Sequence, residues 1–238
     1  MQMKTSRPTT TRRHLSLMAS HRAAAFGLLL FCILPSFFAL AQWKTAKPGK
    51  NYQFPADHHT HPDFQTEWWY FTGNLRASED GHELGYQITW FRQGIRPPGD
   101  RAEVQSRFVI DHLHFVHLAV SDVRRKAHHF EQIAHRGAYG EAGTGAAPAG
   151  QQPLVWVDPC RLTLKEDGSF HIVAKNSDGT LALDLRLRPT RAPVFNGVGG
   201  LSQKAPGEGN GSHYYSLTRM ETTGEVRVDG RSYSQVTG

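Results

Sequence analysis

Apolar and polar residues alternate along much of this chain, with a period of two residues. The alternation recurs in the segments 66–75, 83–92, 106–120, 154–164, 169–175, 180–188, 213–220 and 225–236. A period of two places successive side chains on opposite faces of a β-strand. After residue 41, no window longer than 12 residues keeps the 3.6-residue period of a helix. The pattern therefore predicts an all-β protein.

Short turn sequences separate the alternating segments. They are Glu79-Asp80-Gly81, Glu166-Asp167-Gly168, Asp178-Gly179 and Asp229-Gly230. Asp-Gly between two alternating runs favours a tight hairpin, because glycine readily takes the positive φ that such turns need. We therefore expect antiparallel strands arranged as a barrel or a sandwich. The Gly-, Ala- and Pro-rich stretches 137–153 and 192–212 are expected to be long loops.

Residues 1–41 have the pattern of a secretory signal. An apolar stretch from Ala23 to Leu40 follows a basic segment without acidic residues, and Ala39-Leu40-Ala41 fits a small-x-small cleavage site. Export to the periplasm or the medium is expected. The pair Arg12-Arg13 leaves both the Sec and the twin-arginine (Tat) export routes open.

Charge and cysteine content exclude several classes of protein. The net charge is +6, and the five basic residues within 1–41 leave only +1 on the remainder, so no nucleic-acid partner is expected. Cys32 lies in the expected signal, and Cys160 is expected to be a small core residue. The glycines of 192–212 lack the Lys-Ser/Thr of a phosphate loop, and no cofactor is expected.

The run from His58 to Tyr70 carries the densest chemistry. If residues 66–72 form a strand, Glu67, Trp69 and Phe71 share one face, and Trp68 and Tyr70 lie on the other. A carboxylate between aromatics lies at the rim of a cavity or is buried with a partner. Burial is expected to raise the pKa of Glu67, unless an arginine or a histidine pairs with it.

Two histidine groups are candidate ligands or cavity groups. They are His58, His59 and His61, with Asp57, Asp63 or Glu67 nearby in the chain, and His112 with His114 on one face of a predicted strand. Three readings stay open: a metal site, polar groups of a substrate cavity, and structural hydrogen bonds. The spacing of the first group matches no defined zinc motif. A pair such as His112 and His114 on one strand presents two ligands in some zinc enzymes, but a third would have to come from another strand. No metal is expected.

Aromatic residues also suggest a binding cavity. Tyr86, Ile88 and Trp90 share one strand face, as the apolar wall of a ligand-binding barrel requires. A packed core is the alternative reading. The candidate ligand-binding residues are Trp68, Trp69, Tyr70, Tyr86, Trp90, His112 and His114.

Three blocks carry a family resemblance. They are Phe54-Pro55-x-Asp57-His58 followed by His61-Pro62 and Thr66-Glu67-Trp68-Trp69-Tyr70-Phe71-Thr72-Gly73, then the stretch 85–92, and then the stretch 212–219. Together they resemble the lipocalin-like family of carotenoid 1,2-hydratase (CrtC) and the secreted protein AttH, whose members are often labelled predicted secreted hydrolases. The resemblance spans about residues 50–238.

The resemblance implies two consecutive lipocalin-like β-domains. We expect an N-terminal extension over 42–65 and one such domain over 66–238, with the second domain truncated and normally packed on the first. The resemblance also implies an apolar small-molecule partner, an isoprenoid or a lipid, and proximity to a membrane.

For some members the resemblance implies hydration of a carbon–carbon double bond. Glu67 would then be the acid, with His61 as a relay. The alternatives are a non-catalytic lipid carrier, an envelope or attachment factor, and a secreted hydrolase. A serine hydrolase is disfavoured because Gly-x-Ser-x-Gly is missing, and because adjacent Ser212 and His213 would point to opposite faces of a strand.

Overall fold

The computed structural model describes residues 42–101, 106, 108–145 and 152–238, and the expected signal over 1–41 lies outside them. Its strands are β1 Thr66–Ala77, β2 Glu83–Gly94, β3 His112–Asp122, β4 Ala127–His135, β5 Ala142–Thr144, β6 Val155–Val157, β7 Cys160–Leu164, β8 Phe170–Lys175, β9 Ala182–Pro189, β10 Val194–Phe195, β11 Leu201–Gln203, β12 Gly211–His213, β13 Tyr215–Ser216, β14 Met220–Val228 and β15 Arg231–Thr237. Two single-turn 3-10 helices, η1 Ala56–His58 and η2 Pro98–Asp100, complete the elements. In the described ranges no helix has the length and apolar character needed to cross a membrane.

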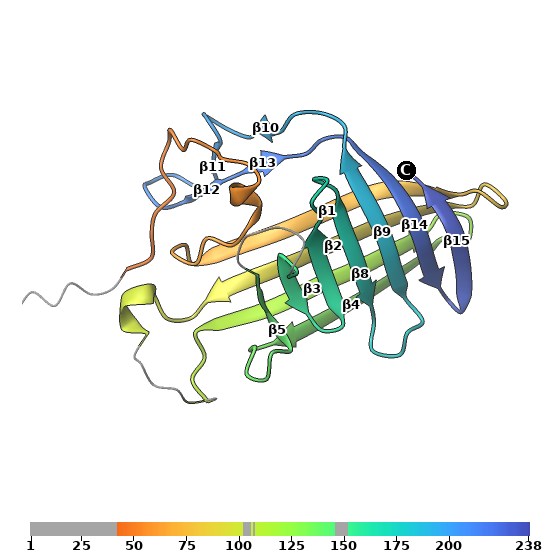
Figure 1. The fold of residues 1–238 in the computed structure, drawn as a ribbon, viewed down its shortest axis with the longest axis horizontal. Coiled ribbons are helices and arrows are strands. Elements are labelled where there is room, and N and C mark those ends of the chain that lie inside the picture. Colours follow the sequence, from red (N-terminus) through yellow and green to blue (C-terminus); the bar gives the residue numbers. More distant parts are fainter. Residues whose placement is uncertain (1–41, 102–105, 107, 146–151) are drawn as a thin grey trace, which may run out of the picture. The chain divides into compact units, whose positions relative to one another are not determined.

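Eleven strands form one antiparallel sheet that is nearly closed into a barrel. The order is β4-β3-β2-β1-β15-β14-β9-β8-β7-β6-β5. Figure 1 shows β1 to β4 as a layer of long strands, with β8, β9, β14 and β15 crossing in front of it. The structure confirms the predicted all-β antiparallel fold.

The hydrophobic core lies between these two layers. Its fully buried side chains include Ile88, Trp90, Val116 and Leu118 from the first layer, and Val155, Leu162, Ile172, Leu185 and Leu187 from the second. Burying each large apolar side chain contributes about 1.5–3 kcal/mol. Cys160 belongs to this core, as predicted, and its burial raises the pKa of its thiol to about 11.

The register of β1 and β2 determines which side chains face the core. Glu67 lies opposite Arg92, and directly opposite residues share a face of the sheet. Tyr86, Ile88 and Trp90 are at most 4% exposed. The predicted division of β2 into an inner and an outer face is therefore confirmed.

The predicted Asp-Gly hairpins are also confirmed. Asp229 and Gly230 connect β14 to β15 with φ values of 51° and 70°, the backbone of a type I′ turn. Gly168 and Gly179 take φ values of 77° and 73° in the connections from β7 to β8 and from β8 to β9.

Strand β4 was not predicted from the pattern. Its inner positions include Glu131 beside Ile133, and an outer position holds Phe130. Hydrophobicity therefore does not alternate along it. Backbone pairing with β3 makes this segment a strand, and such pairing needs no apolar pattern.

Other predicted boundaries also differ from the structure. β3 begins at His112 and not at residue 106. The stretch 137–153, predicted to be a loop, contains β5, which pairs with β6. The stretch 192–212 contains the short strands β10 and β11 and most of β12. These strands have at most three residues each, too few to show a period.

A buried ionic network joins the first layer to β15. His82 Nε2 lies 2.8 Å from Asp122 Oδ1, and both side chains are at most 2% exposed. Arg125 Nη1 donates to Asp122 Oδ2 at 2.5 Å and to the hydroxyl of Tyr233 at 2.8 Å. Burial raises the pKa of Asp122, but hydrogen bonds from the Arg125 backbone, His82 and the Arg125 side chain outweigh it and lower the pKa to about 2.

The first prediction concerns this network. Because the folded pKa of Asp122 is depressed, its contribution to stability is present above the unfolded pKa of about 4 and is lost as the pH falls towards 2. Asp122→Asn should lower the free energy of unfolding by about 3 kcal/mol at pH 7. The difference from the unmodified chain should shrink as the pH falls below 4.

Urea unfolding between pH 7 and pH 2 measures this difference. Asp184→Asn is the matched control, since Asp184 is 60% exposed and pairs with His171 at the surface, and it should cost less than about 1 kcal/mol. A cost of Asp122→Asn that does not change with pH would contradict the assigned network.

Candidate functional site

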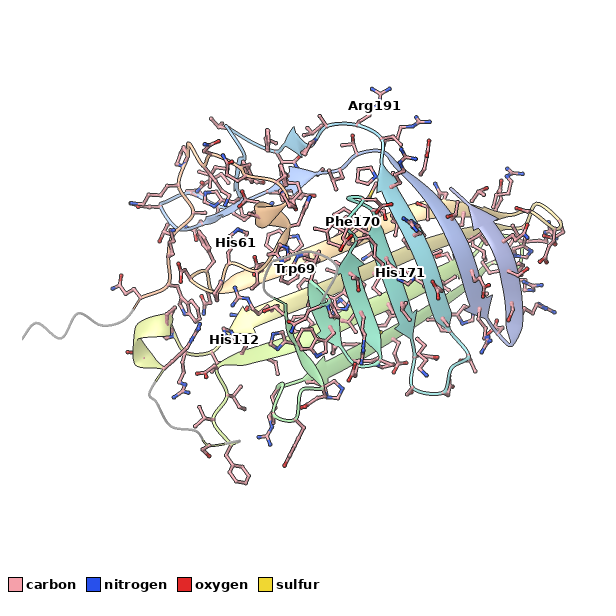
Figure 2. All side chains as sticks on the ribbon, in the orientation of Figure 1. His61, Trp69, His112, Phe170, His171 and Arg191 are labelled. Atoms are coloured by element: carbon pink, nitrogen blue, oxygen red, sulfur yellow. The ribbon has the colours of Figure 1, made fainter. Side chains whose placement is uncertain are left out.

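A cavity of about 1080 Å³ lies alongside β1. Its walls come from the segment 43–65, from both faces of β1, from Phe170 of β8 and Leu187 of β9, and from the segment 204–222. Figure 2 shows His61, Trp69 and Phe170, which all line it. The site is therefore built from the expected N-terminal extension together with the barrel.

Part of the cavity wall on the barrel side is aromatic and aliphatic. This part includes Trp69, Phe71, Tyr86, Phe170, Leu187 and Met220. The rings of Phe71 and Phe170 lie 5.5 Å apart in a tilted arrangement. Gly73 lets the ring of Tyr86 lie against β1, since a Cβ there would be 2.8 Å from Tyr86 Cε1. Such a wall suits an apolar ligand.

Glu67 lies at the polar end of the cavity, within a dense set of donors. His61 Nδ1 lies 2.8 Å from Glu67 Oε1, and the His61 backbone N–H donates to both carboxylate oxygens at 2.9 and 3.0 Å. Thr60 Oγ1 and Arg92 Nε donate to Oε2 at 2.8 and 3.2 Å. The carboxylate is only 15% exposed and Arg92 only 1%. Glu67 therefore anchors the extension to β1 and β2.

His61 bridges two carboxylates. Its Nε2 lies 2.9 Å from Asp57 Oδ1, and its Nδ1 contacts Glu67. Asp57 also pairs with Lys50 Nζ at 2.5 Å. Hydrogen bonding to Glu67 raises the pKa of His61 despite burial, and the bond to Asp57 adds to this rise. An imidazolium with a carboxylate at each nitrogen is the form that this geometry stabilises.

The pKa of Glu67 is lowered in this structure and not raised. Burial does raise the pKa, but the hydrogen bonds from the side chain and backbone of His61 and the charge of Arg92 outweigh it, so the pKa lies below its usual value. This is the alternative foreseen for a glutamate paired with arginine or histidine. The lowered pKa favours the ionised carboxylate form of Glu67.

His58 and Tyr215 form a second polar contact beside the cavity. His58 Nδ1 lies 2.7 Å from the hydroxyl of Tyr215, and Trp69 Nε1 donates to the His58 carbonyl at 2.9 Å. Burial lowers the pKa of His58 to about 4 and raises that of Tyr215. These pKa values leave both groups neutral at pH 7, and the His58 carbonyl holds Trp69 in the cavity wall.

The structure brings together part of the predicted ligand-binding set. Trp68, Trp69, Tyr70 and Tyr86 line the cavity, together with the predicted pair Glu67 and His61. Trp90, His112 and His114 do not line it. Trp90 is fully buried, and its Nε1 donates to the Cys160 carbonyl at 3.3 Å.

His112 and His114 of β3 lie on the inner face of the barrel near Arg92. His112 Nδ1 is 3.3 Å from Arg92 Nη1, and the rings of His112 and His114 are 6.0 Å apart. Burial is the main cause that lowers the pKa values of His112 and His114 to about 4. The charge of Arg92 adds to the lowering for His112, and the charge of His112 adds to it for His114. Among the described residues, no three His, Cys, Asp or Glu side chains form a group that could hold a metal ion.

His58 and His61 form hydrogen bonds near the start of β1, and both also line the cavity. His59 is 8% exposed, its Nδ1 lies 3.5 Å from the Gly145 carbonyl, and its Nε2 has no partner within the described ranges. His213 Nε2 lies 2.9 Å from the Lys47 carbonyl. His213 is therefore directed to the extension.

Sequence reasoning missed three members of this site. Arg92 and Tyr215 were placed only in family blocks, and Asp57 only in a family block and among possible metal ligands. The period of two does supply a signal for Arg92, since it shares a face with Trp90. The contacts of Asp57 with His61 and of Tyr215 with His58 depend on how the extension folds back over the barrel.

The second prediction tests whether Glu67 is a structural anchor. Glu67→Gln removes the charge that balances Arg92 and faces an amide N–H₂ against existing donors, so the free energy of unfolding should fall by about 3 kcal/mol. Glu83→Gln is a matched control, because Glu83 lies opposite Arg76 in the same strand pair but is 54% exposed. The control should cost less than about 1 kcal/mol. Equal costs, measured by urea unfolding at pH 7, would rule out the anchor.

Comparisons with known proteins agree with this architecture. The model of the AttH-like family matches residues 45–238. A candidate AttH protein of known crystal structure from Nitrosomonas europaea is similar, with 29% sequence identity and a TM-score of 0.68. The match covers 82% of this chain and 55% of that one, so this chain spans about half the length of its neighbour. No curated protein matches the chain. The matched region includes β1 to β15 and the residues around Glu67, and the chain belongs to the AttH-like family.

Proposed function

We propose that this protein binds a long apolar molecule, an isoprenoid or a lipid, in the cavity beside β1. The observation that carries the proposal is a cavity of about 1080 Å³ with an aromatic and aliphatic wall. This volume is at the upper end of the range for small-molecule sites, which is about 300–1,000 Å³. Displacing water from such a wall by an apolar chain contributes about 25 cal/mol per Å² of buried surface.

The charges of the site favour holding a ligand over hydrating it. Acid-catalysed hydration needs a group that can give a proton to an alkene. Glu67 accepts hydrogen bonds from His61, Thr60 and Arg92, and its pKa is lowered. Both ring nitrogens of His61 face carboxylates. We therefore propose a carrier or attachment role. Carotenoid 1,2-hydratase activity and secreted-hydrolase activity are the alternatives.

Export is part of the same proposal. The basic and apolar segments within 1–41 support a cleaved signal, and an exported protein with an apolar ligand would work in the periplasm or medium, close to a membrane. A non-catalytic carrier needs no cofactor and no nucleic acid.

The third prediction concerns the ligand. Met220 lines the cavity and packs against the core. Met220→Lys would place an ammonium beside the apolar ligand, so the affinity for an apolar fluorescent probe such as N-phenyl-1-naphthylamine should fall by at least about tenfold. Phe130→Lys is the control, because Phe130 is 56% exposed on β4 and lies outside the cavity walls. The control should leave the affinity unchanged.

Product analysis separates binding from catalysis. An acyclic carotenoid should displace the fluorescent probe from the protein. After incubation it should be recovered chemically unchanged, with no water added to its double bonds. If the unmodified protein forms hydrated product and the folded Glu67→Gln variant does not, the hydratase hypothesis would replace the proposal. Equal affinities of the Met220→Lys and Phe130→Lys variants would place the ligand elsewhere.

The fourth prediction concerns export. In a bacterial host the processed protein should begin at Gln42, after the Ala39-Leu40-Ala41 pattern. N-terminal sequencing of the exported protein checks this, and a start upstream of Ala23 would contradict it. Replacing Arg12 and Arg13 by lysines separates the routes, because only the Tat route requires the arginine pair.

A further inference from the structure

Two carboxylates of the cavity wall already have cationic partners. Asp57 pairs with Lys50 Nζ at 2.5 Å. Glu67 contacts Arg92 Nε at 3.2 Å and His61 Nδ1 at 2.8 Å. The negative charges of Asp57 and Glu67 are therefore balanced without any further cation.

Two lysines of the same wall have no carboxylate partner. Lys44 and Lys204 both line the cavity, and neither ammonium group forms an ion pair within the described residues. Glu208, the acid nearest to Lys204 in the chain, pairs with Lys47 at 3.1 Å. The Asp63 carbonyl accepts a hydrogen bond from the Lys44 N–H, but Asp63 does not line the cavity. Lys44 and Lys204 therefore bring unbalanced positive charge to the wall.

The remaining charges of the wall oppose each other. Arg219 and Glu221 both line the cavity, and only Met220 separates them in the chain. Opposite charges so close in the chain largely cancel at a distance. The net positive charge of the wall is therefore that of Lys44 and Lys204.

Aromatic rings help to position the two ammonium groups. Lys44 Nζ lies 5.6 Å from the centre of the Phe64 ring, and Lys204 Nζ lies 5.3 Å from the centre of the Tyr214 ring. Both rings line the cavity. The face of an aromatic ring attracts a cation, so these contacts favour ammonium positions at the cavity wall.

The two lysines belong to one corner of the cavity. A Cβ at Gly209 would lie 3.8 Å from Thr45 Cγ2, and the Lys204 N–H donates to the Asn210 carbonyl at 2.7 Å. The segment 43–46 thus lies against the connection between β11 and β12, and in Figure 1 the extension, drawn in orange, lies beside these two strands. An anion bound in this corner would offset both positive charges.

A buried hydroxyl on the same hairpin has no partner. Ser212 lines the cavity, and its Oγ is withdrawn from solvent without a hydrogen bond to any described residue. Ser212 lies opposite Ser202, whose Oγ accepts a hydrogen bond from Lys204 Nζ at 2.9 Å. Directly opposite residues share a face of the sheet, so Ser212 and Lys204 lie on one side of the hairpin. A buried donor without a partner is unfavourable, and a ligand oxygen would satisfy it.

We infer that the ligand of this cavity carries an anionic head group, a carboxylate or a phosphate, that binds to Lys44, Lys204 and Ser212. The inference rests on the proposed function and specifies its ligand as a long-chain acid or an isoprenyl or lipid phosphate. Hydrogen bonds from an ammonium group to an anionic oxygen are stronger than those between neutral groups. Lysine suits both head groups, because its ammonium is a compact charge with freely rotating donors. The apolar tail then lies along the aromatic and aliphatic part of the wall.

Displacement of N-phenyl-1-naphthylamine from the protein tests the head group. Dodecanoate, dodecyl phosphate and dodecanol have the same tail and differ in the head. Burial of apolar surface alone favours dodecanol, the least polar of the three. At pH 7 at least one of the two anions should instead displace the probe at a concentration at least about tenfold below that of dodecanol. Preference for dodecanoate alone identifies a carboxylate head, and preference for dodecyl phosphate alone identifies a phosphate.

A double variant tests the two lysines. Lys44→Gln combined with Lys204→Gln should remove the preference for the anion and leave displacement by dodecanol unchanged. Lys126→Gln combined with Lys175→Gln is the matched control, because it removes the same charge from two exposed lysines outside the cavity walls. The control should keep the preference, since exposed charges away from the site are largely screened at about 0.1 M salt.

Ser212→Ala gives an independent measurement. Because the Ser212 hydroxyl has no partner among the described residues, its removal should not lower the melting temperature. The affinity for the preferred anion should fall by about threefold or more. A lower melting temperature with unchanged affinity for the anion would assign Ser212 to the fold and overturn its part in the site.

The head group and the apolar ligand can fail separately. If the probe binds but neither anion displaces it better than dodecanol, the inference is overturned and the proposed apolar ligand stays. A preference for the anion that survives the Lys44 and Lys204 double variant would also overturn the inference. A protein that does not bind the probe at all would overturn the proposed function and the inference together.

Discussion

The carboxylate of Glu67 is the group on which the site depends. It is largely withdrawn from water in an aromatic surrounding, where an unpaired charge would be strongly destabilising. Arg92 balances it from the neighbouring strand, and His61 and Thr60 bind it from the N-terminal segment. One side chain therefore connects two strands of the barrel to the segment that forms the cavity wall.

The same interaction limits the chemistry of the cavity. The donors that make burial of the charge tolerable also lower the pKa of Glu67, and they engage both nitrogens of His61. A proton donor would need the opposite environment, a carboxyl group among apolar neighbours without cationic partners. Further along the wall, His58 and Tyr215 are neutral and hydrogen-bonded to each other.

Strand β1 serves both the cavity and the barrel. Its β2 edge is fully paired and carries the register that places Glu67 opposite Arg92. Within the described residues, strand pairing along its other edge is limited to Arg76 and Ala77, where β15 joins it. The opposite end of the barrel is secured by His82, Asp122 and Arg125 together with Tyr233 of β15. The sheet is thus firmly joined at one end and open along β1 at the other.

The sequence alone determined the fold class and much of the strand pattern. Alternation over 66–75 and 83–92 identified β1 and β2 and their faces, because the period of two is a local property of an extended backbone. Asp229-Gly230 identified its hairpin, because the φ values that it needs are set by those two residues. Only the tertiary structure decided β4, whose mixed face becomes a strand through pairing with β3. It also decided the ionisation of Glu67, since the pKa depends on the distances to Arg92 and His61, residues that the sequence lists but does not place.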